Sequence, residues 1–119
     1  MKITKSEYVV FCDIDYTLIF PKHAIKGYVH TEDMLELPTG NGTRKYAVNL
    51  THLDYIKRLH SRGIIIKLWS GNGFKWCETV AKALEIEHII DECLTKPHYV
   101  IDDKPIESYC KTIFLGKRF

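Results

Sequence analysis

The chain of 119 residues lacks any apolar run near the length of a membrane span, which needs roughly 18 residues. No small-residue cleavage site follows its first lysines, so we expect no secretory leader. It also lacks an excess charge of either sign, because 17 basic and 15 acidic residues leave a formal net charge of +2. Bulk charge therefore gives no reason to expect a membrane surface or a nucleic acid as the partner.

A disulfide framework is also missing. The four cysteines form no CxxC pair, and two of them lie in apolar runs, where a thiol is usually a small core residue. We expect reduced thiols and a cytoplasmic protein. Hydrophobic residues make up 45% and charged residues 27%, as in ordinary globular proteins, so residues 1–119 are expected to form one domain.

The sequence does contain a series of short apolar runs. They are continuous rather than alternating, which is typical of parallel strands buried on both faces. These strands are expected at residues 8–14, 64–69, 99–102 and 112–115. Helices are expected over residues 50–62 and 73–85, with a short turn after Pro105. Thr51 and Asp54 would cap the first helix, and Gly63 would end it.

Strands and helices alternate, which predicts an α/β fold with a Rossmann-like, doubly wound parallel sheet and right-handed crossovers. Residues 20–49 interrupt this order. Asn41 and Gly42 are a strong hairpin signal, and the runs "MLEL" and "KYAV" could pair across it. We expect a small projecting β-hairpin there, rather than a second domain or a cap domain.

Polar residues follow three of the predicted strands. In an open parallel sheet, ligands bind beyond the carboxyl ends of the strands. The three strand ends present Asp13 and Asp15, then Ser70 and Gly71, then Asp102 and Asp103. An Asp pair alone is more often a turn or a helix cap, but the coincidence at three strand ends favours a site. Clustered carboxylates repel one another unless they share a cation, and a few oxygen ligands suit Mg²⁺.

The segment "DIDYT" follows an apolar strand, Ser70 ends a second strand, and a lysine and an Asp pair come later. This arrangement resembles the haloacid dehalogenase superfamily of phosphohydrolases, in a minimal form without a cap. The resemblance covers nearly the whole chain outside residues 20–49. It implies that Asp13 is the nucleophile that forms an aspartyl-phosphate. It also implies that Asp15 is the general acid and base, as in the phosphatases of this family.

The resemblance also implies the ligands of the metal and of the phosphate. Mg²⁺ would be bound by Asp13, by the backbone carbonyl of Asp15 and by Asp102. Asp103 would be either a further ligand or a residue that contacts a ligand without binding the metal itself. The phosphate would be bound by Thr17, Ser70, the amide of Gly71 and a lysine.

Two positions depart from the family pattern. Tyr16 stands where relatives often have Gly, and its ring could stack on a substrate or pack under the hairpin. Lys96 has the place of the motif lysine in chain order, yet five residues separate it from Asp102, whereas a parallel crossover needs about a dozen. Either the helix before the last Asp pair is missing, or residues 89–94 are not a parallel strand. Lys104 is the alternative lysine.

Other side chains stay open to more than one interpretation. Arg44 on the hairpin could contact substrate or only stabilise the hairpin. The histidines at positions 23, 30 and 52 have no metal-ligand spacing, so we expect them on the surface. The two tryptophans are expected in the core.

The sequence therefore predicts a Mg²⁺-dependent phosphomonoesterase that acts through an aspartyl-phosphate. A small phosphorylated metabolite, such as a nucleotide or sugar phosphate, is the favoured substrate. An open site would also suit a macromolecular end, either a polynucleotide 3′-phosphate or a phosphoprotein, although the near-neutral charge disfavours nucleic acid. The hairpin, or a neighbouring subunit in a homo-oligomer, could close the site. A receiver-like phospho-acceptor and an inactive binding module of the same fold are the other two classes.

Overall fold

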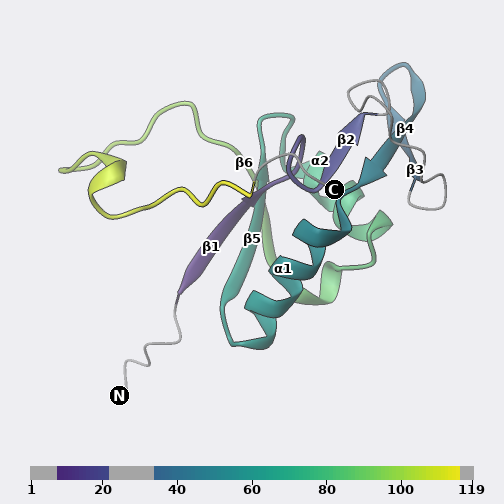
Figure 1. The fold of residues 1–119 in the computed structure, drawn as a ribbon. Helices are drawn as coiled ribbons and strands as arrows, with labels where there is room; N and C mark the ends of the chain where they lie inside the picture. The colour runs from purple at the N-terminus through teal and green to yellow at the C-terminus, as the bar shows by residue number, and fades with distance from the viewer. Residues whose placement is uncertain (1–7, 22–33, 116–119) are drawn as a thin grey trace.

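A parallel sheet of three strands forms the centre of the protein, in the order β1-β5-β6 (Figure 1). The computed structural model describes residues 8–21 and 34–115. The strands are β1 (Val9–Asp13), β5 (Ile65–Ser70) and β6 (Ile90–Thr95). Asp13 pairs with Trp69, and Ser70 pairs with Thr95, so the three strands end almost level with one another. We call this edge of the sheet the carboxyl edge.

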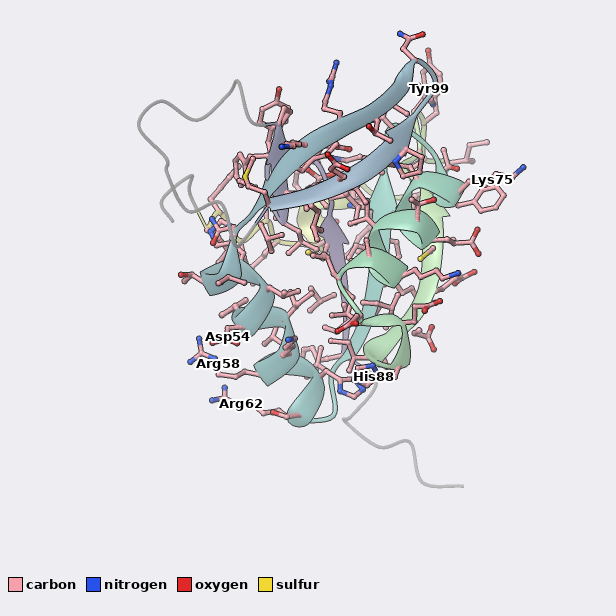
Figure 2. The ribbon with its side chains drawn as sticks, turned by 90° about the vertical axis from the view of Figure 1, so that its right-hand side faces the viewer. Asp54, Arg58, Arg62, Lys75, His88 and Tyr99 are labelled. Carbon is pink, nitrogen blue, oxygen red and sulfur yellow. The ribbon has the colours of Figure 1, made fainter. Side chains whose placement is uncertain are left out.

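Two helices cover one face of the sheet, α1 (Leu50–Ser61) and α2 (Phe74–Ala83) (Figures 1 and 2). Alternate strand residues point into this face, where Cys12, Ile66 and Leu68 are buried. The opposite face carries Phe11 and Trp69, whose rings meet edge to face at 4.7 Å. Within the described residues no helix covers that second face, so the doubly wound arrangement is not formed there. Neither described helix has the length and apolar character needed to cross a bilayer.

A smaller antiparallel sheet lies at the carboxyl edge (Figure 1). Its strands are β2 (Ile19–Pro21), β4 (Gly42–Val48) and β3 (Met34–Thr39), in that order. The predicted hairpin therefore forms, and "MLEL" pairs with "RKYA" in the observed register. Leu37 and Tyr46 are buried in the main core, so the hairpin packs against the domain.

The chain after α2 differs from the sequence prediction. After a 3₁₀ turn, η3 (Glu87–Ile89), residues 90–95 form the parallel strand β6, so the doubt about residues 89–94 is resolved in favour of a strand. The strands predicted at 99–102 and 112–115 are wrong, because residues 96–114 are exposed and contain only the short 3₁₀ turn η4 (Ile106–Ser108) after Pro105. Three residues separate β6 from residue 99, too few for another parallel crossover.

The start of α1 also differs from the prediction. Asn49 is the N-cap, with extended backbone, and its side-chain oxygen accepts a hydrogen bond from the His52 amide at 3.1 Å. Thr51 and Asp54 lie inside the first turns of the helix, so the predicted capping box is wrong. Gly63 follows the end of the helix with a φ of 85°, as predicted for a stop signal.

Replacing the cap tests this assignment. Asn49→Ala removes the oxygen that accepts from the helix amide, so we expect the free energy of unfolding to fall by about 1–2 kcal/mol in urea denaturation. Thr51→Ala is the matched control, since its side chain is exposed, and it should change stability by less than about 0.5 kcal/mol. Equal losses in the two variants would contradict the Asn49 cap.

Candidate active site

Asp13 and Asp15 lie where β1 leaves the sheet. The chain turns sharply after Asp13, because the carbonyl of Ile14 accepts hydrogen bonds from the amides of residues 17, 18 and 19 at 2.9–3.3 Å. Ile14 is fully buried, and this anchors the turn in the core. The two carboxylates are half-buried at the carboxyl edge, as the sequence predicts.

Asp15 is held by three side chains, one from the last residue of β5 and two from the loop and helix that follow it. Its Oδ2 accepts from the Ser70 hydroxyl at 3.2 Å and from Nδ2 of Asn72 at 3.1 Å. The indole N–H of Trp76, in the first turn of α2, lies 3.2 Å from both carboxylate oxygens. Ser70 itself is fixed because its oxygen accepts from the Asn72 amide at 3.0 Å. These donors fix the orientation of the carboxylate.

Asp13 is joined to the far end of its own turn. Its Oδ2 accepts from the Thr17 hydroxyl at 3.3 Å. The Thr17 carbonyl lies 2.6 Å from Nδ1 of His52, and Nε2 of the same ring lies 3.3 Å from the carbonyl of Leu115. His52 is thus buried, and its predicted surface position is wrong. The histidines at positions 23 and 30 lie outside the described residues.

Lys96 lies at the same edge, immediately after β6. Its amide donates to the carbonyl of Ser70 at 2.8 Å, and its Nζ lies 5.6 Å from the centre of the Trp69 ring. Gly71 is exposed in the turn between β5 and α2. Lys104 lies in the exposed C-terminal region, where its amide donates to Asp102 at 3.3 Å. The structure therefore brings Lys96, and not Lys104, to the edge with Ser70.

Tyr16 adopts a left-handed backbone with a φ of 64°. This conformation costs a residue with a side chain about 1–2 kcal/mol and favours Gly. The ring is half exposed and meets Phe20 edge to face at 5.9 Å. Arg44 is exposed on β4.

Asp102 and Asp103 are not brought to Asp13 and Asp15. They are exposed in the region after β6, which Figure 1 shows extending away from the sheet. Hydrogen bonding with Asp103 lowers the pKa of Asp102, and hydrogen bonding with Tyr109 lowers it further. Among the residues that the structure describes, no three Asp, Glu, His or Cys side chains gather as a metal site. The predicted cluster of these four carboxylates therefore does not form within the single chain.

Sequence reasoning missed two groups of the site. The sequence pattern does not single out Asn72, and it predicts only a core position for Trp76. Trp76 contacts Asp15, and its ring centre lies 5.7 Å from that of Tyr46. The usable signal is position, since both residues follow the carboxyl end of β5, where side chains face a ligand site.

A scan of protein-family models finds no match to this chain, and a search of curated proteins finds no match either.

The two thiols below the site are expected to be unreactive. Burial is the main cause that raises the pKa of Cys12 to about 12 and that of Cys77 to about 11. At pH 8 the thiolate fraction is then about 10⁻³ or less, and the thiolate is the form that reacts. We expect iodoacetamide to leave both thiols unmodified in native protein, by peptide mass analysis, and to modify both in guanidinium. Rapid native alkylation of Cys12 would contradict the buried placement.

Proposed function

We propose that this protein is a phosphomonoesterase of the haloacid dehalogenase type that acts through an aspartyl-phosphate, on a Rossmann-like sheet. The observation that carries the proposal is the placement of Asp13, Asp15 and Ser70 together where β1 and β5 end. The nucleophile and the proton donor of the proposed reaction come from one strand end, and a phosphate-binding hydroxyl comes from the next.

The residues suit the two steps of such a reaction. In the first step, a carboxylate oxygen of Asp13 attacks phosphorus, the bond to the leaving oxygen breaks, and Asp15 gives that oxygen a proton. In the second step, water attacks phosphorus, Asp15 takes the water proton, and the bond from Asp13 breaks to release phosphate. Lys96 offers a positive charge for the phosphate oxygens at the same edge, and the buried Ser70 hydroxyl, which donates to Asp15 in this structure, is the proposed phosphate donor.

The metal of the sequence prediction does not fit this single chain. Mg²⁺ prefers near-octahedral oxygen ligands, and the family resemblance requires Asp102 beside Asp13. When bound, Mg²⁺ would shield the phosphate charge from the incoming carboxylate. The described residues supply only the first two carboxylates at the edge, so the metal stays a prediction that depends on how Asp102 reaches the site.

The favoured substrate is a small phosphorylated metabolite, and a polynucleotide 3′-phosphate or a phosphoprotein is the alternative. The half-exposed ring of Tyr16, the residue that follows Asp15, could stack on a base or sugar of either kind of substrate. A panel of nucleotides, sugar phosphates, 3′-phosphorylated oligonucleotides and phosphopeptides separates them by kcat/KM.

The nucleophile is tested directly. Wild-type protein should hydrolyse p-nitrophenyl phosphate with Mg²⁺, and Asp13→Asn should lower kcat by at least about 10³-fold because no carboxylate attacks phosphorus. Asp54→Asn is the control, since this carboxylate lies on the outer side of α1 (Figure 2), and it should keep full activity. Absence of turnover in wild type would contradict the proposal. A phosphorylated Asp13 lasting minutes would instead favour the receiver-like class.

Trp76 is expected to position Asp15. Trp76→Phe keeps the ring beside Tyr46 but removes the N–H from both Asp15 oxygens, so kcat should fall about tenfold while KM and Tm stay unchanged. Phe74→Leu, in the same turn of α2 and exposed, is the matched control and should leave kcat unchanged. If kcat, KM and Tm all change together in Trp76→Phe, its role is structural.

A further inference from the structure

The region that joins β6 to Leu115 exposes an unusual amount of apolar surface. We call residues 97–114 the protruding loop; every one of them is exposed. Tyr99 is 91% exposed, Ile101 fully exposed and Val100 53% exposed, although this run is apolar and β-branched. Contiguous apolar surface of this kind is uncommon on monomers and usually marks an interface.

The free edge of β1 is the complementary surface. β1 is the last strand of the parallel sheet, and within the described residues it pairs only with β5. Val9 and Phe11 are each 43% exposed, and no charged side chain precedes Asp13 within the strand. An apolar edge strand with unpaired backbone groups is a template for another strand.

The same chain cannot make this pairing with Asp102 at the carboxyl edge. A strand that sets Asp102 level with Asp13 starts with Tyr99 level with Val10. Measured from Thr95, this position of Tyr99 lies about 13 Å back along the strand direction and about 14 Å sideways, across three strand spacings. The straight-line distance between the two residues is therefore about 19 Å. The four residues from Thr95 to Tyr99 reach about 14 Å at most.

We propose that residues 99–102 of a second copy pair in parallel with β1, and that this dimer completes the site. Asp102 and Asp103 of the partner subunit then stand beside Asp13 and Asp15. In this register, Val100 of the partner subunit lies beside Phe11, so the two exposed apolar surfaces cover each other. If a two-fold axis relates the two copies, each copy gives its residues 99–102 to the other, and the same contact forms twice. The site contribution rests on the proposed function, whereas the pairing does not.

The dimer is tested first by mass. Light scattering should give about 27.8 kDa, twice the 13.9 kDa chain, and Ile101→Asn should give the single-chain mass because it places a polar group in the pairing run. Ile106→Asn, the same change in the protruding loop outside that run, should stay dimeric. A single-chain mass for wild type at micromolar concentration would overturn the proposal, whether or not the protein is a phosphatase.

The donation of Asp102 is tested by mixing two inactive variants. Asp13→Asn and Asp102→Asn are each expected to lose activity, and their equimolar mixture should recover about 25% of wild-type activity. Half of the dimers are then mixed, and one of the two sites in each has both aspartates. If the wild-type dimer is active and the mixture of the two variants recovers no activity, Asp102 acts in the site of its own chain. That result would overturn the proposal that Asp102 completes the partner subunit's site.

Mg²⁺ binding provides a readout that does not depend on turnover. Calorimetric titration should show binding to wild type and to Ile106→Asn, and at least tenfold weaker binding to Ile101→Asn and Asp102→Asn. Equal Mg²⁺ affinity in the Ile101→Asn monomer and the wild-type dimer would show that the partner subunit's aspartates are not ligands. Failure of phosphatase activity alone, with these affinities as expected, would contradict the proposed function and leave the dimer standing.

Discussion

The parallel pairing of β1 with β5 is the contact on which the rest of the site depends. It sets Asp13 opposite Trp69 and one residue short of Ser70. Because both strands run in the same direction and end together, two sequence segments separated by more than fifty residues deliver polar side chains to one edge. Burial of Cys12, Ile66 and Leu68 under the helices holds this register, since a one-residue slip would turn these apolar side chains to the opposite face.

Asp15 connects the site to the smaller sheet. Its carboxylate is bound by the Trp76 indole, and the Trp76 ring lies against Tyr46 of β4. The hairpin of residues 34–48 is therefore more than a projection, because its buried ring packs on the residue that holds the proposed general acid.

The protruding loop and the free edge of β1 follow from the same constraint. β6 uses the residues up to Thr95 to pair with β5, and only three residues remain before the next apolar run. That run cannot reach the far side of the sheet in the register that sets Asp102 level with Asp13. It is exposed, and within residues 8–21 and 34–115 no strand pairs with the outer edge of β1. The described part of one chain thus leaves two apolar surfaces unburied and holds Asp102 and Asp103 away from Asp13 and Asp15.

The sequence by itself determined the local features. Continuous apolar runs predicted β1 and β5, helical spacing predicted α1 and α2, and Asn41-Gly42 predicted the hairpin, because period and turn chemistry are properties of neighbouring residues. It also placed Asp13, Asp15 and Ser70 at strand ends.

The tertiary structure decided which apolar runs become strands. Residues 90–95 pair with β5 and the more apolar residues 99–102 do not, since pairing depends on connection length and on available edges. It also decided that Trp76 and Asn72 face Asp15 and that His52 is buried, because these contacts join segments that are far apart in the chain.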